Sequence, residues 1–353
     1  MTKQDFFFWM LRSAVSRQPM GEFAMTAYEY KEIIELAEKQ GVVGLIIECL
    51  VNNQVKLKKK CVIHMMKMKN SLIKKNKRLN ERAVEVGNLF ENAGFSYCII
   101  KGQGNNLMYP NPMSRTPGDI DIWVKGSRKQ ISNFVKEKCP DARDGRVHID
   151  FPFFEDAVVE VHYTPSVLSS PISNDRLQKW IKENAETQYS HKVNLPETEG
   201  TISIPTPEFN IIQQLAHIMS HFFIEGIGLR QFVDYYYVLK KARHDVDYEK
   251  TLKHLDLLRF AQGVMWVEKT VFEIEYEYLI TKPNEKIGQL ILNEIVEGGN
   301  FGRHDERYAS RKSGYLARGA TDVIRLLKLS TTFPSEALWG IGRKIINQQW
   351  KIK

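Results

Sequence analysis

Residues 118–124 read GDIDIWV, a short apolar segment that carries two aspartates one residue apart. Side chains alternate across a strand, so Asp119 and Asp121 project to one face while Ile120 and Ile122 project to the other, toward a core. Two carboxylates on one face repel each other unless a cation lies between them. Mg²⁺ typically binds one or two carboxylates together with substrate phosphates. The segment therefore predicts a strand with a metal site on its polar face.

A second predicted strand, residues 157–163 (AVVEVHY), supplies a third acid. Its Glu160 faces away from Val159 and Val161, as alternation along a strand requires. If this strand lies beside residues 118–124, the three carboxylates complete a two-metal site. Such sites catalyse in-line displacement at phosphorus.

A glycine-containing turn precedes both strands. The strand-like residues 97–100 (YCII) break into residues 101–104 (KGQG), which lead into an expected helix. Backbone N–H groups in such a turn and at the start of a helix bind anions. Lys101 and Arg115 add positive charge near the same place. We therefore expect this turn to bind phosphate.

Each of these pieces also has a simpler explanation. An Asp-x-Asp pair is often a solvated strand face, and Glu160 alone is consistent with an exposed strand position. Glycine is the usual residue wherever a turn needs positive φ. The order of the pieces favours an active site: strand, glycine turn, helix, Asp-x-Asp strand and then a glutamate-bearing strand.

This block resembles the DNA-polymerase-β-like nucleotidyltransferase superfamily, and within it bacterial nucleotidyltransferases with a KG…YP…R…DID pattern. The matching residues are 101–110, Arg115, 118–121 and 160–162, and the resemblance is strong over residues 95–165. It implies that Asp119 and Asp121 bind two Mg²⁺ ions, that Glu160 is the third carboxylate, and that a nucleoside triphosphate such as ATP is the substrate. The implied nucleotide-binding residues are Lys101, Gly102, Gln103, Gly104, Arg115, Arg230 and Asp234.

Two residues depart from the superfamily pattern. Gln103 follows Gly102 where a serine is common, so phosphate binding rests on backbone groups, Gln103 or basic residues. Glu160 stands where an aspartate is frequent, and its longer side chain shifts the metal geometry. For Arg230 and Asp234, four residues apart, the alternative is an ordinary ion pair on a helix surface.

The composition describes a globular chain. Its 353 residues are 43% hydrophobic and 26% charged, which excludes a disordered protein. Four cysteines without a Cys-x-x-Cys pair argue against a zinc site and against a disulfide framework. No apolar stretch approaches the roughly 20 residues that span a bilayer, and no targeting signal stands out. We therefore expect a cytoplasmic protein.

The net charge of +8 is concentrated in one amphipathic segment. Apolar residues recur at helical spacing over about residues 57–93, with lysines between them, and Gly94 is placed as a C-cap. The favoured interpretation is a solvated basic face over a packed stripe. The alternative is an electrostatic platform for a polyanion such as RNA. Few aromatic residues interleave with the lysines, so a nucleic-acid partner is left open but not favoured.

The whole chain is predicted to be an α+β protein with a small mixed β-sheet nucleotidyltransferase core between helical regions. We place a helical N-terminal region at 1–94, the catalytic core at 95–200 and a helical C-terminal region at 201–353. In the last region, Thr206 and Pro207 begin a helix on which His217 and His221 share one face. Polar roles in a core or cleft are favoured for these histidines over metal binding.

The predicted reaction is Mg²⁺-dependent transfer of a nucleoside monophosphate from the triphosphate to an acceptor hydroxyl or phosphate, with release of pyrophosphate. Asp119 and Asp121 would bridge the two metals, and Glu160 would hold the metal on the nucleophile side or act as a base. The sequence identifies neither the acceptor nor the oligomeric state. Two alternatives are a catalytically degenerate nucleotide-binding or regulatory module and an RNA-modifying nucleotidyltransferase.

Overall fold

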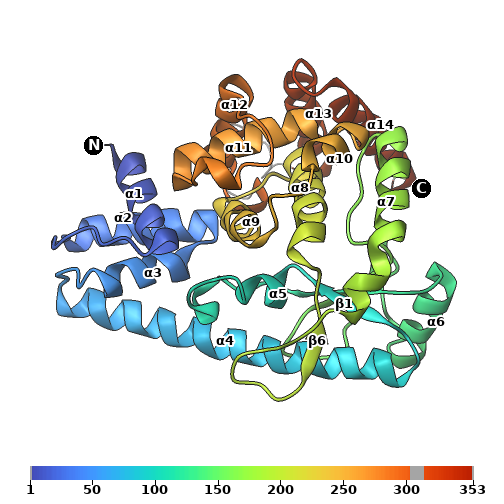
Figure 1. Cartoon of the computed structure of the whole chain (residues 1–353), viewed down its shortest axis with the longest axis horizontal. Helices are drawn as coiled ribbons and strands as arrows, with labels where there is room; N and C mark the ends of the chain where they lie inside the picture. The colour runs from blue at the N-terminus through green and yellow to red at the C-terminus, as the bar shows by residue number, and fades with distance from the viewer. Residues whose placement is uncertain (1, 303–313, 352–353) are drawn as a thin grey trace.

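The computed structural model describes residues 2–302 and 314–351 and has the predicted α+β architecture (Figure 1). A small mixed sheet lies between the long helix α4 and a set of later helices. The longer helices are α1 (Lys3–Ser16), α2 (Ala27–Gln40), α3 (Val43–Asn52), α4 (Lys59–Asn92), α6 (Arg128–Lys138), α7 (Pro171–Ser190), α8 (Pro207–Ile224), α9 (Leu229–Lys241), α11 (Leu258–Phe272), α12 (Glu285–Gly298), α13 (Gly314–Ser330) and α14 (Pro334–Lys351). Two short helices are α5 (Gly102–Asn106) and α10 (Tyr248–His254).

The main sheet has the order β1-β2-β4-β3 and consists of β1 (Tyr97–Ile100), β2 (Ile120–Val124), β3 (His148–Asp150) and β4 (Val159–His162). Strands β2 and β4 are parallel, whereas β1 pairs with β2, and β3 with β4, in antiparallel fashion. A separate hairpin joins β5 (Lys192–Asn194) to β6 (Thr201–Ser203). In the main sheet Asp121 lies opposite Glu160, and His148 lies opposite His162. This register brings the polar residues of three strands to one face.

The other face of the sheet packs on α4. Ile120 and Ile122 of β2 are fully buried in one cluster with Leu79, Val86 and Phe90 of the helix. The helix matches the predicted span of residues 57–93. It ends where Gly94 adopts φ +81° and donates its N–H to the Glu91 carbonyl, as a C-capping glycine does.

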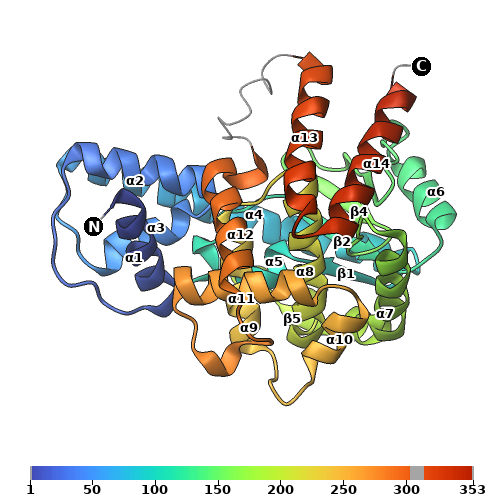
Figure 2. The same ribbon diagram turned by 90° about the horizontal axis from the view of Figure 1, so that it is seen from above.

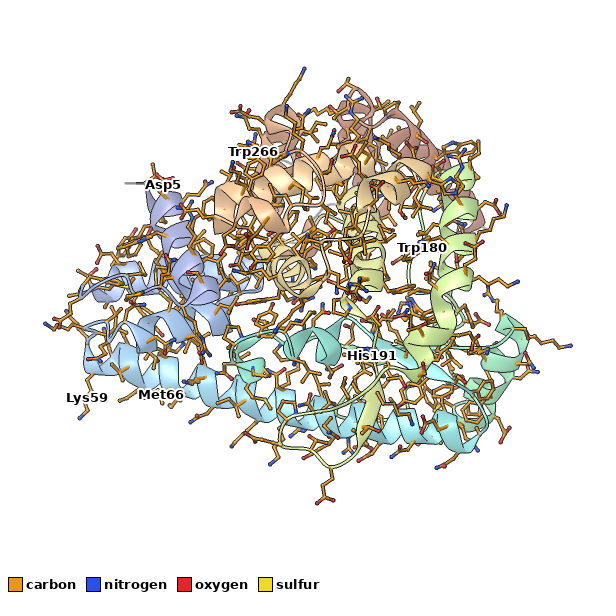
Figure 3. All side chains as sticks on the ribbon, viewed as in Figure 1. Asp5, Lys59, Met66, Trp180, His191 and Trp266 are labelled. Atoms are coloured by element: carbon orange, nitrogen blue, oxygen red, sulfur yellow. The ribbon has the colours of Figure 1, made fainter. Side chains whose placement is uncertain are left out.

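The basic side of α4 faces away from the sheet. Lys59 and Met66 project outward from it in Figure 3. The exposed cations of its surface and of the preceding residues are Lys56, Lys58, Lys59, Lys60, Lys67, Lys74, Lys75, Lys77 and Arg78. The predicted solvated basic face over a packed stripe is therefore present, and a polyanion-binding role for it stays a prediction.

Helices α7 and α8 cover the polar-residue face of the sheet. Trp123 of β2 stacks on Phe209 of α8, with ring centroids 5.9 Å apart, and contacts Tyr189 of α7 at 4.7 Å. Helix α8 begins as predicted, because the Thr206 side chain accepts a hydrogen bond from the Phe209 N–H and Pro207 occupies the first turn. Trp123 thus closes one end of this face and leaves the part around Asp121 open.

The N-terminal and C-terminal helices share a second apolar core. Helices α1–α3 contribute buried residues to the cluster that also contains α8, α9, α11 and α12. Arg12 of α1 donates hydrogen bonds to the carbonyls of Thr270 and Val271 at the end of α11. Figure 2 shows α1–α3 at one end of the molecule and α13 and α14 side by side above the sheet. Over the described residues, no helix combines the length and the apolarity that crossing a bilayer requires.

Candidate functional site

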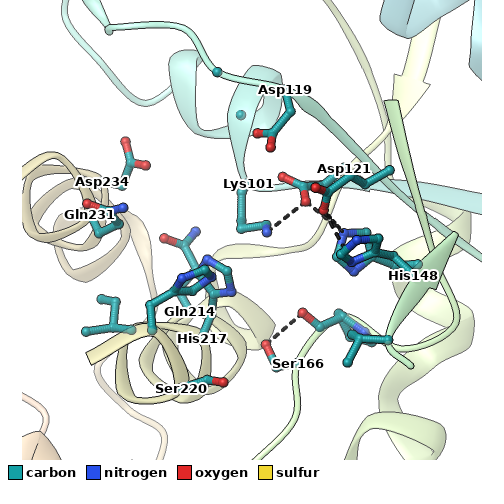
Figure 4. Close-up of a pocket in the computed structure, with 18 of the residues that line it drawn as sticks. Lys101, Asp119, Asp121, His148, Ser166, Gln214, His217, Ser220, Gln231 and Asp234 are labelled. Atoms are coloured by element: carbon teal, nitrogen blue, oxygen red, sulfur yellow. Dashed lines mark hydrogen bonds and ion pairs between the residues drawn. The ribbon is translucent and has the colours of Figure 1, made fainter. Parts of the chain in front are cut away.

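A cavity of about 430 Å³ separates the polar face of the sheet from helices α8 and α9 (Figure 4). All the site residues predicted from the sequence border this cavity except Gln103 and Gly104. They come from the turn after β1, the loop before β2, the strands β2 and β4, and helix α9. The structure therefore brings segments far apart in the sequence to one place.

The three predicted carboxylates converge. Asp119 immediately precedes β2, Asp121 lies within β2, and Glu160 is its register partner on β4. One oxygen from each carboxylate lies within 4.8 Å of one from each of the others. Asp121 is buried, and Asp119 and Glu160 are partly exposed, so the cluster opens into the cavity. Oxygen ligands at this spacing suit a hard divalent cation.

Lys101 reaches into the cluster from an unusual backbone conformation. Its φ of +61° and ψ of −132° are rarely adopted by residues other than glycine. Such a conformation costs on the order of 1–3 kcal/mol and is found mainly at functional sites. The Lys101 Nζ atom lies 2.9 Å from Asp121 Oδ1, and Figure 4 shows its side chain between the two aspartates and α8. The turn therefore directs the Lys101 ammonium group toward the carboxylates of Asp119 and Asp121.

Two histidines beside the carboxylates were not among the predicted site residues. His162 Nε2 lies 2.8 Å from Asp121 Oδ1 and 3.4 Å from Glu160 Oε2. His148 Nδ1 lies 3.4 Å from Glu160 Oε2 on the other side. The signal for His162 was available in the sequence, because it follows Glu160 by two residues and so shares its strand face.

The ionisation of the cluster is uneven. Repulsion from Asp121, followed by burial, raises the pKa of Asp119. Burial opposes ionisation of Asp121, but Lys101 and His162 outweigh it and hold the pKa of that carboxyl well below its usual range. Burial likewise opposes ionisation of Glu160, but a hydrogen bond from His162 lowers its pKa overall. Burial lowers the pKa of His162, whereas Asp121 and Glu160 raise it by more. The positive charges of Lys101 and His162 thus partly balance the negative charge of the carboxylate cluster.

Arg115 is bound to a carboxylate rather than free to bind phosphate. Its Nε and Nη2 atoms donate to Asp234 Oδ1 and Oδ2, both at 2.8 Å, and the Tyr109 hydroxyl donates to Oδ1 at 2.7 Å. Both members of the ion pair are buried. This corrects two expectations from the sequence. Arg115 offers no uncompensated charge, and Asp234 is a buried partner of Arg115 rather than half of a surface pair with Arg230.

Arg230 borders the cavity near the first aspartate. Its Nη1 atom donates to the Thr116 carbonyl at 3.5 Å, and the same atom lies 3.4 Å from the position of a β-carbon on Gly118. Burial, followed by the charge of Arg115, lowers the pKa of Arg230. A β-carbon at position 118 would therefore be in van der Waals contact with this guanidinium.

Gln103 and Gly104 lie behind the cavity wall instead of in it. Gln103 is only 1% exposed and sits in the short helix α5. A β-carbon on Gly104 would lie 3.1 Å from Ile204 Cγ2, so the glycine permits close packing against the chain that follows β6. Their position corrects the expectation that Gln103 and the backbone of Gly104 border the phosphate site. Of the KGQG turn, Lys101 and Gly102 reach the cavity.

His217 and His221 line the opposite wall, on α8. Their rings are 4.3 Å apart, centroid to centroid. Burial, followed by the charge of Lys101, lowers the pKa of His217 well below its usual value. A neutral imidazole here agrees with the cleft-facing polar role that the sequence favours.

Comparison with known proteins identifies the family. A family model described as "Uncharacterised nucleotidyltransferase" matches residues 26–273, well over half of the chain. A solved structure of an antigenic nucleotidyltransferase-like protein from Paracoccidioides brasiliensis matches with 11% identity and a TM-score of 0.35, covering 60% of this chain and 96% of that one. No curated protein matches the sequence. On the family match, the chain belongs to this uncharacterised family of nucleotidyltransferases.

Proposed function

We propose that the protein is a Mg²⁺-dependent nucleotidyltransferase. It transfers a nucleoside monophosphate from a nucleoside triphosphate to a hydroxyl or phosphate of an acceptor and releases pyrophosphate. The observation that carries this proposal is the convergence of Asp119, Asp121 and Glu160 in one cavity, with carboxylate oxygens within 4.8 Å of one another. Family membership supports the reaction class.

The donor set of the cavity fits Mg²⁺. Asp119, Asp121 and Glu160 offer the hard oxygen ligands that this ion requires, and the low pKa of Asp121 keeps that ligand ionised. Asp119 and Asp121 would hold the metal at the triphosphate, and Glu160 would complete the site on the acceptor side. Bound Mg²⁺ would neutralise the phosphate charge and lower the pKa of the attacking hydroxyl.

The basic residues of the cavity bind and orient the triphosphate. Lys101 and Arg230 both border the cavity, and so do Gly102 and Gly118, whose lack of a side chain leaves their backbone groups open to a ligand. Lys101 changes partners, from Asp121 to a phosphate oxygen, when nucleotide enters. We assign the catalytic core to residues 95–200, with α8 and α9 closing the cavity from the C-terminal region.

Glu160 and His162 act on the acceptor. The Glu160 side chain is one quarter exposed, so an acceptor hydroxyl can reach it and transfer a proton to its free oxygen. His162 contacts both Asp121 and Glu160 and thereby fixes the relative orientation of the two carboxylates. On this assignment the acceptor binds on the β3–β4 side of the cavity.

One observation favours a second candidate, a degenerate nucleotide-binding module. Lys101 Nζ and His162 Nε2 both lie within hydrogen-bond distance of Asp121 Oδ1, at 2.9 and 2.8 Å. In that case protein cations permanently fill the position that a metal takes in the enzyme, and the triphosphate is bound without being turned over.

Label transfer distinguishes the two candidates. The purified protein is incubated with each α-³²P-labelled nucleoside triphosphate, Mg²⁺ and a cell extract that supplies the acceptor. We expect label to enter an extract component with the wild type and with Asp175→Asn, an exposed acid remote from the cluster, but not with Asp121→Asn. If Asp121→Asn labels the extract as strongly as the wild type, the proposed nucleotidyltransferase activity at this site is contradicted. Nucleotide binding without labelling by any variant supports the degenerate module.

A further inference from the structure

His148, Glu160 and His162 form a second ligand cluster beside the aspartates. His148 and His162 are register partners on β3 and β4, and Glu160 shares their face of the sheet. His148 Nδ1 and His162 Nε2 each lie 3.4 Å from Glu160 Oε2, and the three ligand atoms are all within 4.8 Å of one another. Two imidazoles and one carboxylate therefore converge on one point.

We propose that His148, Glu160 and His162 bind a divalent transition metal such as Zn²⁺ or Mn²⁺, adjacent to the aspartates that bind Mg²⁺ in the proposed function. Imidazole nitrogen suits transition metals, whereas Mg²⁺ takes oxygen ligands. Ligand atoms about 2.1 Å from a tetrahedral Zn²⁺ are separated by about 3.4 Å. The two nitrogen–oxygen distances already match this separation.

His162 is the most buried of the three proposed ligands. The residue is 6% exposed, and its Nδ1 atom is buried without a hydrogen-bond partner among the residues that the structure describes. Buried polar atoms of this kind normally have a partner, because leaving one unpaired costs about 1–3 kcal/mol. This Nδ1 is the ring nitrogen opposite the proposed ligand atom Nε2, so support for the metal comes from the three converging ligand atoms alone.

The surroundings of His148 resemble those of a metal-binding histidine. Its Nδ1 faces Glu160, while its Nε2 lies 3.4 Å from Asp150 Oδ1. A carboxylate at the far nitrogen fixes the ring orientation and tautomer of a ligating histidine. His148 is also one-third exposed, so a metal and a further ligand can enter from solvent.

The ligand types differ from those that the sequence prediction considered. The absence of a Cys-x-x-Cys pair argues against zinc only for cysteine-ligated sites, and His217 and His221 lie across the cavity on α8. The present ligands come from two strands, and a hairpin brings them together.

The inference rests on the proposed function for its Mg²⁺ neighbour, with which it shares Glu160, but the arrangement of the three ligand atoms does not depend on turnover.

Calorimetric titration with Zn²⁺ and, separately, with Mg²⁺ tests the site. The wild type should bind one Zn²⁺ tightly, and His148→Ala should bind it at least about 100-fold more weakly. Asp150→Asn, which removes no ligand, should weaken Zn²⁺ by about 10-fold to 100-fold. His254→Ala, at an exposed histidine elsewhere, should match the wild type and exclude adventitious surface binding.

A separate set of outcomes distinguishes this inference from the proposed function. Asp119→Asn should weaken Mg²⁺ binding and abolish nucleotidyl transfer while Zn²⁺ binding persists. Equal Zn²⁺ affinity for the wild type and a folded His148→Ala, verified by circular dichroism, overturns the transition-metal site even if Mg²⁺-dependent transfer is intact. Tight Zn²⁺ binding that depends on His148, without any nucleotidyl transfer, supports the transition-metal site and contradicts the proposed nucleotidyltransferase activity.

Discussion

Arg115 and Asp234 form a buried, bidentate ion pair although 119 residues separate them in the sequence. Arg115 lies in the loop that leads to the two aspartates, and Asp234 lies on α9 in the C-terminal region. The Tyr109 hydroxyl binds the same carboxylate. These hydrogen bonds hold the loop before β2 against helix α9, which forms one wall of the cavity. They thereby hold Asp119 in place relative to Arg230.

Removing one member of this pair should destabilise the fold strongly. We expect Asp234→Asn to lower the free energy of unfolding by about 3–5 kcal/mol, because it leaves the buried Arg115 guanidinium uncompensated. Urea denaturation measures the change. The matched control is Asp175→Asn, which breaks an exposed ion pair with Lys179 and should change stability by at most about 1 kcal/mol.

A double substitution tests whether the loss comes from the unpaired charge. Arg115→Met combined with Asp234→Leu should recover most of the stability, since apolar replacement of a whole buried pair is often neutral. A loss for Asp234→Asn no larger than that of Asp175→Asn would contradict the buried pair.

The two aspartates should respond to amidation in opposite directions. Asp119→Asn should raise the melting temperature of the metal-free protein, because it removes the repulsion that raises the pKa of Asp119. Asp121→Asn should lower the melting temperature, because it loses charged hydrogen bonds to Lys101 and His162. The expected loss of unfolding free energy is about 1.5–3 kcal/mol.

Thermal melts in the presence of a chelator decide the point. The sequence alone predicts a higher melting temperature for Asp121→Asn, because an acid pair without its metal repels. The contacts of Asp121 reverse that expectation. Shifts of the same sign for the two variants would show that Lys101 and His162 do not distinguish them.

Glu268 on α11 should make stability fall as the pH rises. It is fully buried, and neither carboxyl oxygen has a hydrogen-bond partner in the part of the chain that the structure describes. Burial raises the pKa of Glu268 well above its ordinary 4.5. The folded protein therefore retains a proton that the unfolded chain releases. Stability is full below the unfolded pKa and declines as the pH rises toward the folded pKa.

Denaturation at several pH values measures this effect. Glu268→Met should raise the unfolding free energy by about 1–3 kcal/mol at pH 8 and remove this part of the pH dependence. Glu137→Gln, at a side chain that is 70% exposed, should leave the pH dependence of the wild type intact. If Glu268→Met kept the wild-type pH dependence, Glu268 would not be its source.

The elements with local signals were predictable from the sequence. Helix α4 follows from the spacing of its apolar residues, and the start of α8 follows from Thr206 and Pro207. The convergence of Asp119 and Asp121 follows from strand alternation, which depends only on neighbouring residues.

The parts that depend on long-range pairing were harder to predict. The ion pair of Arg115 was not predicted because its partner Asp234 lies in another region of the chain, and a sequence pattern does not reveal such a contact. Gln103 and Gly104 follow the expected turn, but only the tertiary packing on Ile204 shows that they face away from the cavity.

The Mg²⁺ dependence of nucleoside triphosphate turnover tests the central proposal most directly. Pyrophosphate release is followed against Mg²⁺ concentration, with extract as the source of acceptor, for the wild type, Asp121→Asn and the control Asp175→Asn. Loss of a metal-binding carboxylate removes several kcal/mol of transition-state stabilisation, so Asp121→Asn should be at least about 100-fold slower. The control should match the wild type. Turnover by Asp121→Asn at the wild-type rate, or no Mg²⁺-dependent turnover by the wild type, would contradict the assignment of this cavity as a nucleotidyltransferase active site.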